Sequence, residues 1–202
     1  MLLDHLAVSG RTLAEATAFV EDALGVKMQP GGAHAVFHTH NTLVGLEDGL
    51  YLEAIAINPD AAIPDQPRWF NLDQFKGPAQ LTNWICRTDD LPHDMALMPD
   101  GIGTPVALQR GDLRWDMVVP DSGLLPFDNL CPALIRWNTS DHPATRLAPS
   151  GCRLKRLTVS HPQADDLANH LGKALSDDRI AYEVGACGMR AEFDTPHGPR
   201  LL

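Results

Sequence analysis

The sequence lacks a long hydrophobic run, a basic cluster and a secretory start. No apolar stretch approaches the roughly 18 residues that a membrane-spanning helix needs. The opening MLLDHLAVSG has no basic region followed by a long apolar segment, so no secretory signal is evident. With 16 basic and 26 acidic residues the formal charge is −10, which argues against nucleic acid or an anionic membrane as a partner. We expect a cytoplasmic protein with neither of these partners.

Cysteine pairs and the common catalytic motifs are also missing. The four cysteines are scattered and form no C-x-x-C pair, which predicts reduced thiols rather than a zinc knuckle. The chain has no Gly-rich phosphate loop and no G-x-S-x-G nucleophile turn, so nucleotide, hydrolase and thiol mechanisms receive little support. The triplet Arg110-Gly111-Asp112 resembles an adhesion motif, but its composition is typical of a hairpin turn.

What the sequence does contain is a recurring order of elements. A strand at 2–8 precedes a helix at 13–24, which Thr12 and Glu15 begin as a capping box and Gly25 ends. Three further strands are predicted at 34–38, 42–47 and 51–57, the last two joined by a turn at Asp48-Gly49. Residues 1–59 therefore predict a β-α-β-β-β module, which suits a chain of 202 residues with room for several such units.

The same order returns twice. Residues 79–139 predict a second module, with strands at 80–87, 105–109, 113–119 and 132–138 and a short irregular helix between the first two. Residues 152–202 predict a third, shortened β-α-β module whose start, RLKRLTVSHP, echoes LLDHLAVSG. After its helix, strands are predicted at 180–184 and 189–194. The Pro-rich segments 59–78 and 140–151 are predicted linkers. This repetition indicates modules arranged around a common sheet within one domain.

Two ionisable residues stand inside apolar strand patterns. His5 lies in the first strand, and Glu53 lies in the last strand of the first module. Side chains alternate along a strand, so both are expected to face the concave side of the sheet. A dry, unpaired carboxylate is too costly there. The pair therefore suits an internal hydrogen bond without a ligand, a metal site, or metal-free acid–base catalysis, and the sequence leaves these three open.

Other polar and aromatic residues predict a cavity around this pair. Thr39, His40 and Asn41 are polar residues that enter an otherwise apolar strand, as at a cavity rim, although turn or edge positions would explain them too. If the preceding strand is continuous, His34, His38 and His40 share one face. Trp84 and Trp137 belong to the first and last strands of the second module and suit the walls of a small-molecule pocket, or the core.

These motifs resemble the vicinal oxygen chelate superfamily, and within it a bacterial family with a glyoxalase-like domain. The resemblance is carried by LDHL at 3–6, GGAH at 31–34, THN at 39–41 and YLEAIA at 51–56 before Asn58-Pro59. It implies an α+β fold in which repeated β-α-β-β-β modules curve into an open barrel around a ligand cavity. It also implies a homodimer and a divalent metal such as Zn, Mn, Fe or Ni that chelates oxygens of a substrate.

Carried over to this chain, the resemblance makes His5 and Glu53 the two metal ligands of the first module. By sequence register Trp84 corresponds to His5, and 134–136 correspond to Glu53, so the second module supplies no matching pair. A metal would then need His40, water or another subunit to complete its ligands.

The leading hypothesis is an enzyme of the lyase or isomerase type that acts on a small oxygen-rich molecule. Glu53 would be a metal ligand or general base, and His5 a metal ligand or hydrogen-bond donor. His40, Thr39 and Asn41 would orient the substrate. One alternative is a metal-free protein that binds or sequesters a small molecule beside Trp84 and Trp137. A ring-cleaving dioxygenase ranks lower, because only half of its two-His-one-carboxylate iron site is visible.

Overall fold

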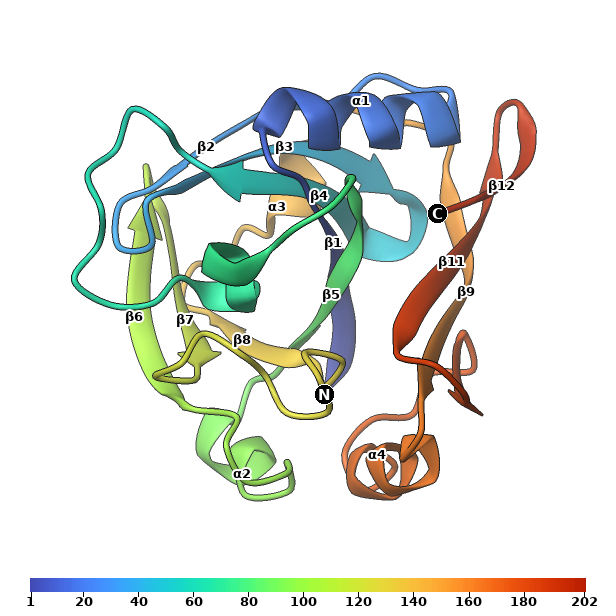
Figure 1. Ribbon diagram of the computed structural model, residues 1–202. Coiled ribbons are helices and arrows are strands. Elements are labelled where there is room, and N and C mark those ends of the chain that lie inside the picture. Colours follow the sequence, from blue (N-terminus) through green and yellow to red (C-terminus); the bar gives the residue numbers. More distant parts are fainter.

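The computed structural model describes residues 1–202 and contains one large curled sheet with a smaller sheet beside it (Figure 1). The large sheet has eight strands in the order β2-β3-β4-β1-β5-β8-β7-β6. Their bounds are β1 (Leu2–Ser9), β2 (Gln29–His34), β3 (Thr39–Leu46), β4 (Leu50–Ile57), β5 (Gln80–Arg87), β6 (Thr104–Arg110), β7 (Leu113–Val119) and β8 (Ala133–Trp137).

The large sheet is built from two halves with the same strand order. In each half the first strand runs parallel to the last, as β1 does with β4 and β5 with β8. The two halves join where β1 and β5 pair antiparallel. The sheet curls until its outer strands β2 and β6 come near each other, which closes most of a barrel (Figure 1). This confirms the predicted α+β fold class with its curved open-barrel sheet.

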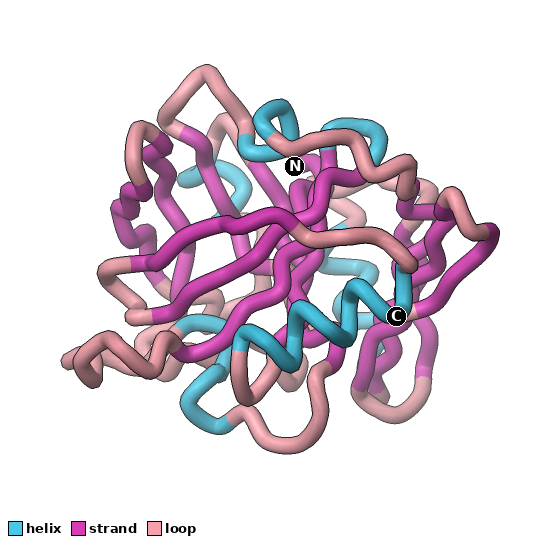
Figure 2. The backbone as a smooth tube through the Cα atoms, turned by 90° about the horizontal axis from the view of Figure 1, so that it is seen from above, coloured by secondary structure: helices cyan, strands magenta, loops and turns pink.

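Helix α1 (Leu13–Leu24) covers the outer face of the first half. The Thr12 hydroxyl accepts a hydrogen bond from the Glu15 backbone N–H, and Gly25 ends the helix with a φ of 72°, as its sequence predicts. The helix buries Ala16, Val20 and Leu24 and lies across β4 and β3 (Figure 2). None of the helices has the length and apolar character needed to cross a membrane.

The C-terminal segment forms a separate sheet of four strands in the order β10-β9-β11-β12. Its elements are β9 (Arg153–His161), α4 (Ala164–Leu171), β10 (Ile180–Val184), β11 (Gly188–Thr195) and β12 (Gly198–Leu201). Strands β10 and β11 thus lie where the sequence predicts them, and β12 is an additional strand. The strand order of this sheet differs from that of the two halves. This sheet packs behind β5, and both sheets share one core that includes Trp84 and Phe193 (Figure 1).

Two sequence-based predictions about the first half and its linker are wrong. Residues 35–38 form a turn rather than a strand, and the strand lies earlier, over Gln29–His34. The prediction failed because Gly31 and Gly32 are typical of a break, whereas here they lie inside β2, where neighbouring side chains leave no room for a Cβ.

The predicted linker 59–78 contains the short 3-10 helix η2 (Trp69–Gln74), which fills one mouth of the barrel. Its Trp69, Phe70 and Leu72 are buried core residues rather than linker side chains. The remaining short elements are η1 (Glu47–Gly49), α2 (Leu91–Met95) and α3 (Pro143–Arg146). The last of these lies in the second predicted linker.

Candidate functional site

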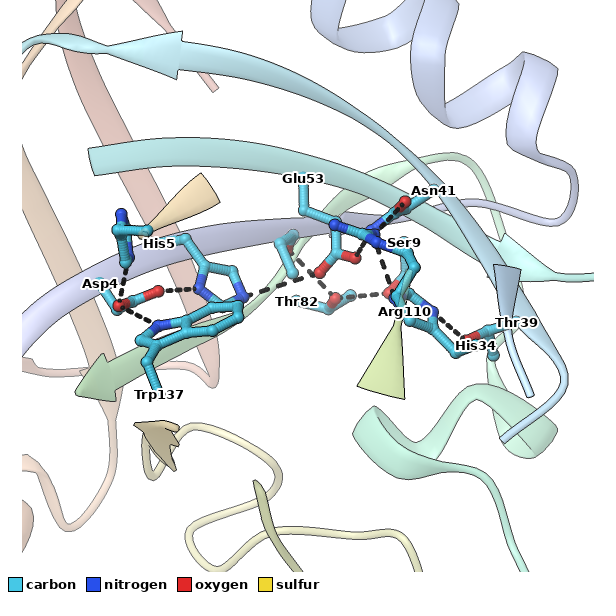
Figure 3. Close-up of polar contacts among 12 residues, drawn as sticks. Asp4, His5, Ser9, His34, Thr39, Asn41, Glu53, Thr82, Arg110 and Trp137 are labelled. Carbon is cyan, nitrogen blue, oxygen red and sulfur yellow. Dashed lines mark hydrogen bonds and ion pairs between the residues drawn. The ribbon is translucent and has the colours of Figure 1, made fainter. Parts of the chain in front are cut away.

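A small polar cavity of about 30 Å³ lies inside the curled sheet. Its walls come from both halves of the sheet and from η2, and consist of His5, His34, Asn41, Leu43, Tyr51, Glu53, Trp69, Phe70, Arg110, Trp115, Met117, Ile135 and Trp137. Such a volume holds only one or two water molecules. The walls therefore close tightly around a few polar groups, most of which Figure 3 shows.

His5 and Glu53 face each other across this cavity. Strand pairing sets Glu53 directly beside Ala7, so that His5 is its diagonal neighbour on the same face of the sheet. The imidazole Nε2 lies 3.7 Å from Glu53 Oε2, and both side chains are buried (Figure 3). The structure thus brings together the two residues on which the sequence-based hypothesis depends.

Asp4 holds the His5 ring from behind. A bulge in β1 leaves Asp4 without a partner on β5, whereas Leu3 and His5 on either side of it are paired. The fully buried carboxylate accepts hydrogen bonds from His5 Nδ1 at 2.6 Å, His142 Nε2 at 2.9 Å and Trp137 Nε1 at 3.1 Å. Burial alone would raise the pKa of Asp4, but the bonds from His142 and His5 hold it well below its usual range.

An ionised Asp4 fixes the tautomer of His5. The carboxylate can only accept, so Nδ1 carries a proton and Nε2 is directed at Glu53. The ring also stacks on Tyr51, with centroids 4.3 Å apart and planes 13° apart. His5 is therefore oriented from two sides, which is what a group that transfers a proton at Nε2 requires.

Asn41 positions the other oxygen of Glu53. Its amide Nδ2 donates to Glu53 Oε1 at 2.5 Å, while its Oδ1 accepts from the Gly32 backbone N–H at 2.8 Å and from Arg110 Nη1 at 3.1 Å. A Cβ at Gly31 would lie 2.0 Å from Asn41 Oδ1, and one at Gly32 would lie 2.7 Å from Arg110 Cδ. The two glycines therefore make room for the amide and for the arginine.

His34 contributes a neutral ring to the same wall. Its Nδ1 lies 2.9 Å from the Thr39 hydroxyl, and its ring meets the edge of Trp69. Burial, with a further effect from the positive charge of Arg110, lowers the pKa of His34 to about 3. The ring therefore carries no charge at neutral pH, and Arg110 is the permanently charged group beside it.

Some of the predicted site residues lie at the cavity and others do not. Asn41 and Trp137 line the cavity, and Thr39 supports it through His34. His40 does not line it, because it alternates along β3 with Thr39 and Asn41 and so faces away. Trp84 is fully buried on the opposite face of β5, where its Nε1 donates to the Leu130 carbonyl. The expectations that His40 and Trp84 contact a ligand here are corrected.

Four residues that shape the site were not predicted. Asp4 precedes His5 in an apolar strand, so its charge was a usable signal. Arg110 was assigned only to a hairpin turn; Gly111-Asp112 does form that turn, but Arg110 ends β6 and reaches the cavity. Trp69 and Phe70 belong to the predicted linker, where no periodicity marks them as buried.

A second, open cavity of about 290 Å³ lies on the outer side of η2. Phe70 lines both cavities and thus separates them. Its backbone is left-handed, with a φ of 59°, as is that of Asn71 with a φ of 55°. Such a conformation costs a residue with a side chain about 1–2 kcal/mol. The partition between the two cavities is therefore a strained part of the chain.

The second half of the sheet offers no metal ligands at the equivalent positions. Trp84 pairs with Leu6 and so lies on the opposite face of the sheet from His5, which rules out the predicted correspondence of Trp84 with His5. The β5 and β8 residues on the face of His5 include no histidine and no carboxylate; they are Asn83, Ile85, Ala133 and Ile135. The chain thus provides two facing donors, whereas zinc sites use three or four protein ligands. This donor set does not fit the four-residue metal site that the superfamily implies.

A different group of side chains that could hold a metal lies beside the outer cavity, which Asp128 and Cys187 line. Asp128, His161 and Cys187 have donor atoms within 4.8 Å of one another. His161 Nδ1 accepts a hydrogen bond from the Gln163 backbone N–H, so the neutral ring carries its proton on Nε2 and donates it to Asp128. As it stands, the cluster is satisfied by hydrogen bonds.

Solved structures share this fold at low sequence identity. A hypothetical protein from Staphylococcus aureus matches with a TM-score of 0.64 and 14% identity over 92% of this chain and 87% of its own. Methylmalonyl-CoA epimerase from Mycobacterium tuberculosis matches with a TM-score of 0.41 and 15% identity over 67% of this chain and 85% of its own. Methylmalonyl-CoA epimerase from Streptomyces coelicolor, in complex with 2-nitronate-propionyl-CoA, matches with a TM-score of 0.43 and 16% identity over 68% of this chain and 97% of its own. At these identities the likeness concerns the fold alone.

No curated protein sequence matches this chain. The model of the glyoxalase-like domain family, however, matches residues 3–175. Because this match spans well over half of the sequence, the chain belongs to the glyoxalase-like domain family.

Proposed function

We propose that this protein is an enzyme of the lyase or isomerase type that removes a proton from carbon beside a carbonyl group of a small oxygen-rich molecule. The observation that carries the proposal is the pair of His5 Nε2 and Glu53 Oε2, buried 3.7 Å apart at a cavity. A carboxylate and an imidazole on the two sides of a reacting group are suited to general base and general acid roles.

In the proposed step, Glu53 takes the proton from carbon. The electron pair of the broken C–H bond moves into the new C–C double bond, and the carbonyl oxygen becomes an enolate. His5, in the cationic form that carries a second proton on Nε2, donates a hydrogen bond or that proton to the oxygen. Return of the proton to the other face of the same carbon gives an epimerisation. In a 2-hydroxy carbonyl compound, the hydroxyl can lose its proton to become the new carbonyl while the former carbonyl carbon takes up a proton, which is an isomerisation. Loss of a leaving group from the next carbon gives an elimination.

The surroundings support these roles. Asn41 holds one oxygen of Glu53, which leaves Oε2 directed toward His5. Asp4 keeps a proton on His5 Nδ1 and stabilises positive charge on the ring when Nε2 is protonated. Trp115 and Trp137 exclude water, which strengthens the electrostatic interaction with a developing enolate.

The proposed step does not use a metal, since the chain supplies only two facing donors at this cavity. The metal-dependent version of the hypothesis would need water or substrate oxygens to complete the ligand set. Elemental analysis of untagged protein tests it: near-stoichiometric Zn, Mn, Fe or Ni, reduced in the Glu53→Gln variant, would favour that version.

A metal-free binding protein is the second candidate. The aromatic walls of the cavity and the lack of a second ligand pair on β5 and β8 favour it. The two candidates differ in what Glu53 does: it is chemically required in the enzyme and only a polar contact in the binding protein.

Deuterium exchange separates the two candidates. Pyruvate, 2-oxobutanoate and neutral hydroxyacetone are incubated with the protein in D2O, and loss of the C–H signal next to the carbonyl is followed by NMR. An enzyme accelerates exchange on at least one of them, and Glu53→Gln lowers that rate by roughly 10²- to 10⁴-fold. Exchange at the background rate with all three compounds would favour the binding protein.

A matched variant controls for the substitution itself. Glu47→Gln makes the same change at an exposed position in η1 and should leave the exchange rate unchanged. If Glu53→Gln lowers only thermal stability, Glu53 has a structural role and the proposal fails.

A further inference from the structure

Arg110 brings a positive charge to the cavity without an acidic partner. It ends β6, and the only hydrogen bond of its side chain runs from Nη1 to Asn41 Oδ1 at 3.1 Å. Other arginines of the chain are neutralised: Arg68, Arg136 and Arg179 each reach an aspartate at 2.7 Å or less. A guanidinium has five N–H donors, so Arg110 retains most of its binding capacity.

We infer that the cavity takes a small carboxylate, whose acid group displaces the one or two waters that fit there and binds the guanidinium of Arg110. This rests on the proposed function, because it identifies the substrate class of the same site. Guanidinium and carboxylate pair through two parallel hydrogen bonds, which fixes the orientation of the bound molecule as well as its charge. A half-buried cation with a single amide partner is suited to such a ligand.

The position of Arg110 relative to Glu53 supports this orientation. The Asn41 amide bonds Arg110 through its oxygen and Glu53 through its nitrogen, so one amide group separates the guanidinium from the carboxylate. A carboxylate on Arg110 therefore leaves the next carbons of the ligand beside Glu53 and His5. The ligand of this geometry is a small acid with a carbonyl group close to its carboxylate.

The charges around the cavity leave no other group for this role. An anion near Glu53 is repelled unless a cation compensates. His34 stays neutral, since burial lowers its pKa to about 3. His5 and His142 are both bonded to Asp4. Arg110 is thus the group at the cavity with both a permanent charge and free donors.

Intrinsic fluorescence tests the inference, because three of the four tryptophans (Trp69, Trp115 and Trp137) line the cavity. The full chain is titrated with the carboxylates glycolate and lactate, and with their neutral isosteres glycolamide and lactamide. We expect a saturable change in emission with at least one carboxylate and none with the corresponding amide at the same concentration.

Substitutions identify the group that recognises the acid. Arg110→Gln should weaken carboxylate binding about ten- to hundredfold, since it removes hydrogen bonds to a charged group. Arg110→Lys should bind the carboxylate more tightly than Arg110→Gln but less tightly than wild type, because lysine keeps the positive charge but lacks the two parallel N–H donors of a guanidinium. Arg114→Gln, an exposed arginine on the neighbouring strand β7, should have no effect.

Three results would overturn the inference: binding of the amides as tightly as the acids, unchanged affinity in Arg110→Gln, or no saturable change with either acid. The Glu53→Gln variant separates this failure from that of the proposed function. If it retains Arg110-dependent carboxylate binding but no protein form catalyses exchange, the inference stands and the enzyme proposal fails. If wild type exchanges hydroxyacetone but not the acids, the proposal stands and the inference fails.

Discussion

Asp4→Asn is the substitution whose effect the structure determines most fully. The Asp4 carboxylate is fully buried and accepts three N–H donors, from His5, His142 and Trp137. An asparagine of the same shape keeps one oxygen, but its NH₂ group must face at least one of these donors. His5 then loses the partner that keeps the proton on Nδ1.

The expected loss of stability is large. Removing one partner from a buried, charged hydrogen-bonded group costs about 3–5 kcal/mol, and a domain has only about 5–15 kcal/mol in total. Because the pKa of Asp4 is lower in the folded chain than in the unfolded chain, its charge stabilises the fold above the unfolded value of about 3.9. That contribution is lost progressively as the pH falls from about 5 toward the folded pKa. Over this pH range the free energy of unfolding should therefore decrease more steeply with falling pH in wild type than in Asp4→Asn.

Urea unfolding followed by tryptophan emission measures both effects, at pH 7 and in steps down to pH 3. Asp112→Asn is the matched control, because Asp112 pairs with Arg146 at an exposed position, and such a pair contributes little to stability. A loss below about 1 kcal/mol in Asp4→Asn, with an unchanged dependence on pH, would refute the argument that Asp4 is an ionised anchor for His5.

Three further predictions test the surroundings of the cavity. Gly31→Ala should lower the free energy of unfolding by about 1–3 kcal/mol, because its Cβ would meet Asn41. Gly185→Ala is the control, since a Cβ there has open space around it and should leave the stability unchanged. Equal effects of the two substitutions in urea unfolding would contradict this argument. Phe70→Ala should join the two cavities and increase acrylamide quenching of the tryptophans; unchanged quenching would mean that Phe70 is not the partition. His34 should stay neutral in NMR titrations from pH 8 to pH 5, because burial lowers its pKa to about 3, and a midpoint near 6.5 would contradict it. Since the unfolded chain binds that proton first, His34 should also make stability fall as the pH drops below about 6.5.

Strand alternation made much of the fold predictable from the sequence. The two halves of the large sheet, helix α1 with its caps and the convergence of His5 with Glu53 all follow from periodicity and turn chemistry. These features are local, or depend on two strands whose faces the apolar pattern defines. A sequence reports such features directly.

What the sequence did not reveal depends on contacts between distant segments. Gly31 and Gly32 are required by Asn41 and Arg110, and Arg110 belongs to the other half of the sheet. Phe70 enters the barrel from a segment with no regular pattern. His40 was assigned to the cavity because 39–41 were predicted as a polar rim in front of a strand at 42–47. In the structure they lie inside β3, where neighbouring side chains point to opposite faces.

The account depends most on His5 and Glu53 acting as one unit, and a double-mutant cycle on the exchange rate tests this directly. His5→Asn retains a group near Nδ1 for Asp4 but removes Nε2, and Glu53→Gln removes the base. If both residues serve the same proton transfer, the double variant should be no slower than the slower single variant. Losses that multiply in the double variant, or a His5→Asn variant as fast as wild type, would contradict the account.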